Sequence, residues 1–328
     1  MRTLAKNAWP IGRLVVAALL MGWIFLRLWK EPQGLDFRAW HPHWPLLLAA
    51  GHILLLGAFL LGITRWRILM HSHHIGLSWR RCFTLFFIGQ FFNAFLLGST
   101  GGDMVKAYYA ARESHHRKTE AATLVFLDRL IGLSALLFLA LGVMTWRIRF
   151  VQTQPSLDKA ALLMLALLLL LAGGLALLWS RNWLERPFWK RWTSGRLAPI
   201  TAHVERIYGA VYHFKSQPRV LAQSFALSMG VHGLSLLSCF VFACALRSGL
   251  SLFQAFIFFP LIGALGALPL TPGGLGVREG GAVLLFGAIG IPPATAFLLS
   301  LLPYVSGLLW SLFGGLLYLT QSEKARLP

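Results

Sequence analysis

The sequence predicts an all-α integral membrane protein, a polytopic helical bundle in which two oppositely oriented re-entrant hairpins form an inverted repeat. Three observations predict this fold class. Apolar residues make up 57% of the chain and charged residues 12%, which is about half the charged share of a soluble domain. Lys and Arg are spread unequally over the segments between apolar runs, and one glycine-rich motif occurs twice.

The apolar runs are long enough to cross a bilayer, for which roughly 20 residues are needed. Six runs contain no Lys, Arg, Asp or Glu: 44–64, 82–102, 160–180, 220–246, 248–277 and 280–322. Two further segments, 11–29 and 121–146, are nearly as apolar. Segment 11–29 has a basic start but no convincing small-residue cleavage site, so we expect a retained helix rather than a signal peptide.

The distribution of the 30 Lys and Arg residues predicts the orientation. An amino terminus in the cytoplasm places 20 of them on the cytoplasmic side, including Arg65 and Arg67, and 7 on the opposite side. Three cations, Lys106, Arg129 and Arg278, then lie within the membrane region. Because cytoplasmic loops are enriched in basic residues, we expect a multi-pass protein of the bacterial cytoplasmic (inner) membrane with both termini inside.

This count holds only if two apolar stretches enter and leave the membrane on the same side. Residues 82–111 begin and end beside basic residues and carry polar GSTGGD at their middle, and residues 253–291 carry LTPGGLGVREG. We expect both stretches to be re-entrant hairpins of opposite sense within a single transmembrane domain, 1–328. A last helix is expected at 294–320, after the Pro-Pro pair interrupts the apolar run.

The two hairpins share a motif at an offset of 172 residues. Thr100 to Lys106 reads TGGDMVK and Pro272 to Arg278 reads PGGLGVR, so two glycines, a valine and a basic residue coincide. Inverted-repeat transporters carry such paired interruptions of apolar sequence at their binding sites.

The glycine-rich tips are the predicted substrate-binding site. Bare backbone turns tightly, and amides at the start of a half-helix point at anionic groups; Lys106 and Arg278, one turn later, are expected to hold a lipid phosphate between the tips. The predicted substrate-binding residues are Asn93, Ser99, Thr100, Gly101, Gly102, Asp103, Lys106, Asp128, Arg129, Thr271, Gly273, Gly274, Arg278 and Glu279. The glycines have an alternative explanation, which is close packing of helices. For Asn93 the alternative role is a hydrogen bond across the helix bundle.

Embedded ionisable groups are expected to pair or to face water, because Asp or Arg costs roughly 2.5–3.5 kcal/mol at the bilayer centre. Asp128 and Arg129 point about 100° apart on a helix, so we expect each to pair elsewhere. We predict that Asp103 pairs with Arg129, and Glu279 with a cation of the first repeat. A buried ion pair that fixes helix register is the structural alternative.

No HExxH, P-loop, Ser-His-Asp or paired-carboxylate motif is present, and we expect no catalytic residue, cofactor or metal site. Cys82, Cys239 and Cys244 are interpreted as small buried hydrophobes, and the HSHH cluster at 71–74 is a weak metal signal without a carboxylate. The basic, Trp-rich loop 181–219 is typical of an interfacial amphipathic segment rather than of a nucleic-acid site.

Three segments together resemble a known family: GQFFNAFLLGSTGGDMVKAYYA (89–110), FLDRLIGL (126–133) and LPLTPGGLGVREGG (268–281). They are similar to the flippase-like transmembrane family that includes the membrane part of lysylphosphatidylglycerol synthases. The resemblance covers nearly the whole chain and implies the membrane domain only, without the aminoacyltransferase domain of the full synthases. Family members commonly carry Pro-Gly-Arg where this chain has Gly98-Ser99-Thr100, so no role of that Pro or Arg carries over.

The resemblance implies a lipid flippase or transporter that moves an anionic or zwitterionic lipid between leaflets, such as an aminoacyl-phospholipid or a polyprenyl-phosphate-linked glycan, with a lipid-synthesising enzyme as a partner. Two other functions stay open. A membrane enzyme acting on a lipid phosphate would use the same acids for proton transfer. A non-catalytic scaffold of a glycolipid-synthesis complex would tolerate substitutions at both hairpin tips.

Overall fold

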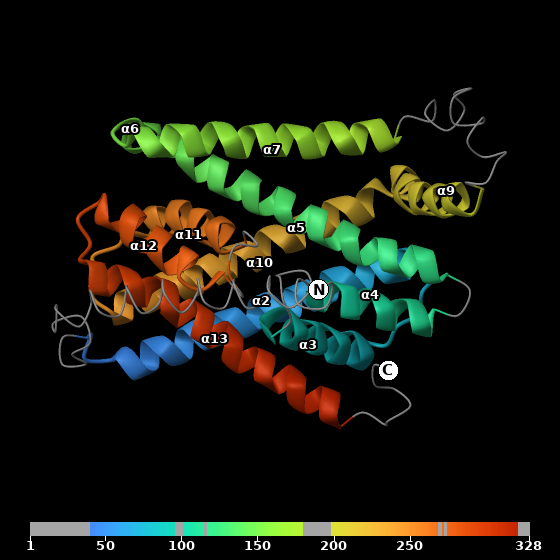
Figure 1. Ribbon diagram of the computed structural model, residues 1–328, viewed down its shortest axis with the longest axis horizontal. Coiled ribbons are helices and arrows are strands. Elements are labelled where there is room, and N and C mark those ends of the chain that lie inside the picture. Colours follow the sequence, from blue (N-terminus) through green and yellow to red (C-terminus); the bar gives the residue numbers. More distant parts are fainter. Residues whose placement is uncertain are drawn as a thin grey trace, which may run out of the picture. The chain divides into compact units, whose positions relative to one another are not determined.

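The computed structural model describes residues 40–95, 101–114, 117–179, 198–267, 271 and 274–320. Within these ranges the regular elements are helices and no strand occurs (Figure 1). The predicted first helix at 11–29, the tip residues 98–100 and the Trp-rich part of the loop after residue 180 lie outside the described ranges.

Five of the described helices are long and apolar enough to cross a membrane, which confirms a polytopic helical membrane protein. They are α2 (Trp44–Ser72), α5 (Lys118–Trp146), α7 (Pro155–Trp179), α10 (Pro218–Ala245) and α13 (Pro293–Leu319). Leu and Ala are frequent in these segments, and both residues favour helix. The last helix begins at Pro293, since proline suits the first turn of a helix, and its range agrees with the predicted 294–320.

The helix α2 extends further than its uncharged run 44–64 predicts. It continues to Ser72 and buries Trp66, Leu69 and Met70 beyond the end of that run. Arg65 is itself only 8% exposed. Arg65 therefore lies within a helix and is enclosed by other helices, while its assignment to the cytoplasmic side stays a prediction.

Shorter helices form two helix–break–helix pairs. The first pair is α3 (Trp79–Phe95) and α4 (Gly101–Glu113), and the second is α11 (Leu252–Ala267) and α12 (Val277–Gly287). Each is shorter than the roughly 20 residues that a crossing helix needs. These pairs coincide with the stretches predicted as hairpins, while their depth and sense in the membrane stay predictions.

Contacts at both ends show that α3 and α4 run antiparallel. Near the open end, Arg81 Nε donates to Glu113 Oε1 at 2.7 Å. Near the closed end, the Gly102 amide donates to Asn93 Oδ1 at 2.7 Å, which satisfies one of the N–H groups that a helix start leaves without an intrahelical partner. A Cβ at position 102 would overlap the Gly89 carbonyl oxygen, so this close approach requires glycine.

The second hairpin is closed by glycines in the left-handed region. Gly274 and Gly276 have φ of 71° and 82°, values that residues with a Cβ rarely adopt. A Cβ at position 274 would overlap the Gly266 carbonyl oxygen of α11. The Gly276 amide donates to Glu279 Oε2 at 2.6 Å, which caps α12 in the manner of a capping box.

The order of helices occurs twice along the chain. A long helix, a helical hairpin and another long helix follow one another from α2 to α5 and again from α10 to α13. The first residues of corresponding helices are 173 to 176 positions apart, close to the offset of 172 between the glycine motifs. The internal repeat therefore extends from the motif to whole helices.

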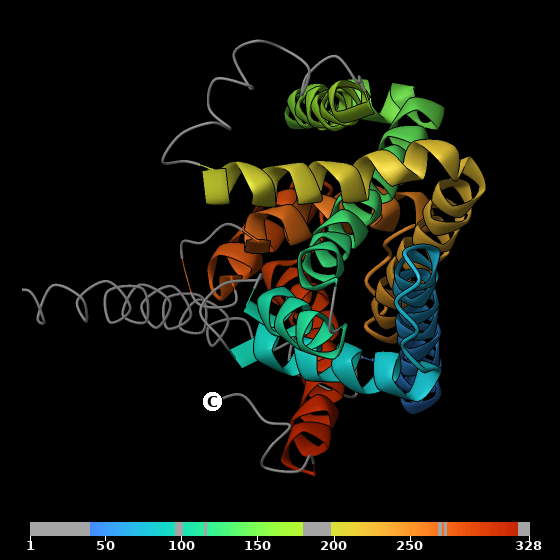
Figure 2. The same cartoon turned by 90° about the vertical axis from the view of Figure 1, so that its right-hand side faces the viewer.

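Between the two sets lie α6 (Ile148–Gln152), α7, α9 (Ala198–His213) and the short 3-10 helix η4 (Phe214–Ser216). α5 packs against both α7 and α9, and the three helices lie together in Figures 1 and 2. α9 buries Tyr208, Ala210 and Val211. The end of loop 181–219 is thus a helix that rests on protein, and its position at a membrane surface stays a prediction.

The described chain divides into two compact units. One contains the described residues up to Ala58, those within 86–102 and those from Gly233 onward, and it includes the α11–α12 hairpin packed with α13. The other contains Phe59–Leu85 and Asp103–His232. Each unit contributes one group of buried charges.

Candidate functional site

A cluster of buried charges is centred on Asp128 of α5, in the second unit. Asp128 Oδ1 accepts a hydrogen bond from Arg65 Nε at 2.7 Å, and Asp128 Oδ2 lies 3.5 Å from Lys106 Nζ. None of the three side chains is more than 10% exposed. Three helices thus bring two cations to one carboxylate, and we call Arg65, Lys106 and Asp128 the Asp128 cluster.

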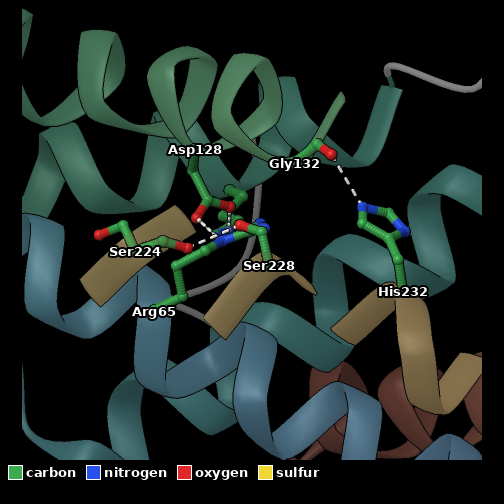
Figure 3. Close-up of polar contacts among 7 residues, drawn as sticks. Arg65, Asp128, Gly132, Ser224, Ser228 and His232 are labelled. Carbon is green, nitrogen blue, oxygen red and sulfur yellow. Dashed lines mark hydrogen bonds and ion pairs between the residues drawn. The ribbon is translucent and has the colours of Figure 1, made fainter. Parts of the chain in front are cut away.

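Serines of α10 hold the far side of Arg65. Arg65 Nη1 donates to Ser228 Oγ at 2.7 Å, and Ser228 Oγ donates to the Ser224 carbonyl oxygen at 2.7 Å. Because a hydroxyl has one proton, this second bond leaves the Ser228 lone pairs to accept from Arg65. Figure 3 shows Arg65 between Asp128 and the two serines.

Lys106 lies one turn beyond the start of α4 and contacts an aromatic ring as well as a carboxylate. Its Nζ is 4.0 Å from the centroid of the Trp66 ring, within the range of a cation–π interaction. Trp66 is fully buried. Two consecutive residues of α2 therefore contact the ion pair of Lys106 and Asp128. Arg65 binds Asp128, and Trp66 lies against Lys106.

A histidine and a glycine border the cluster. His232 Nε2 lies 2.9 Å from the Gly132 carbonyl oxygen, and since a carbonyl only accepts, Nε2 carries the proton (Figure 3). His232 thus has its hydrogen-bonding need met inside the helix bundle. A Cβ at position 132 would lie 3.1 Å from Arg65 Nη1, so the small residue leaves room for the guanidinium.

Asp103 of α4 and Arg129 of α5 form an ion pair separate from the Asp128 cluster. Arg129 Nε donates to Asp103 Oδ2, which confirms the predicted pairing. Asp128 and Arg129 also find separate partners, as their angle on the helix predicts. The Arg129 side chain is 52% exposed while that of Asp103 is largely buried, so this pair lies at the surface of the unit.

Arg278 is the centre of the charge group in the first unit. Its guanidinium donates to Glu279 and, through Nε, to Ser300 Oγ at 3.2 Å, and its central carbon lies 4.0 Å from the centroid of the Tyr304 ring. Glu279 is fully buried. The structure therefore pairs Glu279 with its neighbour Arg278, where we predicted a cation of the first repeat.

The basic residues of the two hairpins make corresponding contacts. Lys106 reaches Asp128 and Arg278 reaches Ser300, in both cases 22 positions later along the chain. Ser300 also follows Asp128 by 172 residues, the offset of the glycine motifs. Corresponding positions thus hold a carboxylate in one repeat and a hydroxyl in the other.

The predicted substrate-binding residues divide between the two units. Asp103, Lys106, Asp128 and Arg129 lie together in the second unit. The first unit holds Asn93, Gly101, Gly102, Thr271, Gly274, Arg278 and Glu279. Ser99, Thr100 and Gly273 lie outside the described residues. Asn93, Gly102 and Gly274 have structural tasks in closing the hairpins.

Sequence reasoning missed Arg65, Trp66, Ser228, Ser300 and Tyr304. Apolar residues resume after Arg65, at Trp66 and at 68–70. This continued apolar pattern is a signal that the helix does not end at Arg65. Adding the repeat offset to Asp128 would have found Ser300. Ser228 and Tyr304 carry no signal in the sequence, since serines and tyrosines occur widely in membrane helices.

Apolar crossing helices, broken hairpins and buried charges define a multi-spanning membrane protein with a polar interior site. A family model described as the lysylphosphatidylglycerol synthase TM region matches residues 11–312, and the chain belongs to this family. The match confirms the resemblance that three segments carry. A UPF0104 membrane protein of Methanothermobacter thermautotrophicus is 25% identical over 274 residues, which is 78% of this chain and 78% of that protein. No solved structure matches the chain.

Proposed function

We propose that the protein is a lipid flippase or transporter that moves an anionic or zwitterionic lipid between the leaflets of the bacterial inner membrane. The observation that carries the proposal is a pair of basic side chains, buried Lys106 and largely enclosed Arg278. Each follows the break of a hairpin, and each contacts the following long helix. Membership in the family is consistent with a lipid-related function in a membrane.

The chemistry of these positions suits a lipid phosphate. Buried cations are costly in a membrane and accompany substrate pathways, and half-helix starts present amides to anionic groups. In the proposal Lys106 and Arg278 each bind a lipid phosphate, the glycines that precede each of them in the sequence allow the backbone to approach it closely, and the acyl chains stay in the bilayer. Candidate lipids are aminoacyl-phospholipids and polyprenyl-phosphate-linked glycans supplied by a lipid-synthesising enzyme.

The site also contains acids that can release a cation to the substrate. Asp128 binds Lys106 at 3.5 Å, longer than its 2.7 Å bond to Arg65, so Lys106 is the cation less tightly held by this carboxylate. In the second repeat the acid that binds Arg278 is Glu279. The position that corresponds to Asp128 is the neutral Ser300, which also accepts from Arg278. We propose that Lys106 exchanges Asp128 for the lipid phosphate during transport.

Reconstitution tests this function. Purified protein in liposomes is given a fluorescent phospholipid or a labelled polyprenyl phosphate, and movement between leaflets is measured by reduction or extraction of the outer-leaflet probe. Lys106→Gln and Arg278→Gln are expected to abolish transport, and Lys106→Arg to retain part of it. The exposed cations Lys159 and Arg149 provide matched controls, since Lys159→Gln and Arg149→Gln remove the same charges outside the site.

Three results would count against the proposal. If wild-type protein moves neither probe, or if the two site variants transport as well as their controls, the basic residues have no transport role. If the labelled lipid is instead chemically converted, and conversion requires Asp103 or Glu279, the protein is a membrane enzyme.

A further inference from the structure

A cavity lies where α2 ends and α10 begins. It has a volume of about 400 Å³ and is lined by Arg67, Ile68, His71, Ser72, Gln217 and Val220. All six residues belong to the second unit. Arg67 follows Arg65 by two positions, and two residues on a helix point about 200° apart, so the cavity lies on the side of α2 that faces away from the Asp128 cluster.

The polar lining of the cavity favours an anion. Arg67 Nε is buried and has no hydrogen-bond partner among the described residues. Among the described residues, no Asp or Glu lines the cavity. His71 Nδ1 donates to the Arg67 carbonyl oxygen at 3.1 Å, which holds the ring at the cavity that Arg67 also lines. The guanidinium carries further N–H donors besides Nε, and a phosphate is the acceptor whose geometry fits a guanidinium best.

The position of the cavity favours a lipid as the source of that phosphate. α2 and α10 are both candidate membrane spans, and the cavity lies at the end of one and the start of the other. The ends of spanning helices are expected at the depth of lipid headgroups. Ile68 and Val220 add apolar walls. The first turn of α10 also faces this end, and its positive dipole favours an anion.

We propose that this cavity binds the phosphate of an anionic phospholipid at the membrane surface, with Arg67 as the principal donor and Ile68 and Val220 against the glycerol and upper acyl carbons. The site is distinct from the transport site and does not rest on the proposed function. It gives the protein a lipid ligand that stays in one leaflet.

Binding of phosphatidylglycerol to the purified full-length protein tests the proposal. The number of bound lipids is counted by native mass spectrometry, and the lipid-induced rise in Tm is followed in detergent. Arg67→Gln is expected to weaken binding at this site roughly tenfold, the factor that one charge-assisted hydrogen bond supplies. Val220→Trp, which fills the cavity and keeps Arg67, is expected to block binding as well.

Arg149→Gln and Lys159→Gln, at exposed positions outside both sites, are the controls and should retain this bound lipid. Circular dichroism verifies that each variant is folded, and the cavity-filling variant tests the site even if Arg67→Gln does not fold. Full binding by both Arg67→Gln and Val220→Trp would overturn the proposal. Equal stabilisation by phosphatidylcholine would indicate an apolar site, and equal stabilisation by millimolar inorganic phosphate would indicate a soluble anion; either outcome overturns the assignment to an anionic lipid.

Discussion

Asp128 binds two cations at once, and the stability of this arrangement depends on keeping the three charges together. Arg65 has a further acceptor in Ser228, and Lys106 has a further contact in the Trp66 ring. Removing one partner of a buried ion pair is strongly destabilising because it leaves a charge uncompensated. The cluster therefore fixes the packing of α2, α4 and α5 in addition to any role in binding.

Asp128→Asn is expected to lower the free energy of unfolding by about 3–5 kcal/mol, because the amide cannot neutralise Arg65 and Lys106. Unfolding in mixed micelles, followed by circular dichroism, measures this change. Asp158→Asn is the control, since Asp158 is exposed in the first turn of α7, and a surface change alters stability within about 0.5 kcal/mol. Equal stability of the two variants would contradict the role of the cluster.

His73 gives the protein a pH dependence outside the membrane spans. Burial lowers the pKa of His73 below its usual value of 6.5, and the charges of His213 and Arg117 lower it further, while a backbone hydrogen bond to Ala210 raises it. The unfolded chain therefore binds a proton more readily than the folded one. This contribution to stability is fully present above pH 6.5 and is lost as the pH falls toward the lowered pKa.

The measurement is the Tm in detergent as a function of pH. Wild-type protein is expected to lose stability below pH 6.5, and His73→Gln to lose less over the same range. His43→Gln, at an exposed histidine, should behave as wild type. A pH profile that is unchanged by His73→Gln would show that other groups cause the loss.

Partners of single residues could be predicted from the sequence only where geometry left one choice. Asp128 and Arg129 diverge on one helix, and Asp103 is a nearby acid at the start of the preceding helix, so the pair of Asp103 with Arg129 followed. Arg65 could not be placed, because a charged residue at the end of an apolar run is equally typical of a loop and of a helix interior. Only the tertiary fold encloses it.

At the scale of elements, glycine packing closes both hairpins. Gly102 meets the backbone of α3 and Gly274 that of α11, at Gly89 and Gly266 respectively. The second glycine of each pair thus allows two helices to pack closely, as the alternative explanation of the glycines predicts. It does not exclude ligand binding, since backbone that packs closely on one side can present amides on the other.

Gly274→Ala is expected to destabilise the protein by at least about 1–2 kcal/mol, because the left-handed conformation disfavours a Cβ by this amount and the added methyl overlaps α11. Gly307→Ala in α13 is the control. A Cβ at Gly307 meets nothing within 4 Å, and alanine favours a helix over glycine by about 1 kcal/mol. The Tm of the two variants should therefore change in opposite directions, and a shared direction would contradict this account of the hairpin.

The boundaries of the elements followed largely from hydrophobic length and from glycine and proline. Pro293 marked the start of α13, and the glycine motifs marked the breaks between α3 and α4 and between α11 and α12. The end of α2 was missed by eight residues, because tertiary packing continues the helix past two arginines. Local sequence carries no record of the partners that make such a continuation favourable.

The described part of the chain contains two similar sets of helices with α6, α7, α9 and η4 between them in the sequence. The repeat was predictable from one motif because an offset shared by a motif also relates the helices around it. How deep the hairpins lie, and which way each opens, was not decided by helix lengths. A charge count supplies that orientation, and it remains a prediction for experiment.

Cysteine labelling tests the predicted orientation in a background that lacks Cys82, Cys239 and Cys244. With a membrane-impermeant maleimide on intact cells, Arg149→Cys is expected to react, while Lys215→Cys, Arg80→Cys and Arg112→Cys react only after permeabilisation. Arg80 and Arg112 flank the first hairpin and should share one side. Labelling of these two positions from opposite sides would show that the stretch 82–111 crosses the membrane.

The difference between the charge groups of the two repeats has an electrical consequence. The Asp128 cluster carries one formal positive charge, from Arg65, Lys106 and Asp128, whereas Arg278 and Glu279 sum to zero. A transmembrane voltage acts on one elementary charge with about 2.3 kcal/mol per 100 mV. Any displacement of the first group along the field is therefore coupled to the membrane potential, while an equal displacement of the second is nearly voltage-independent.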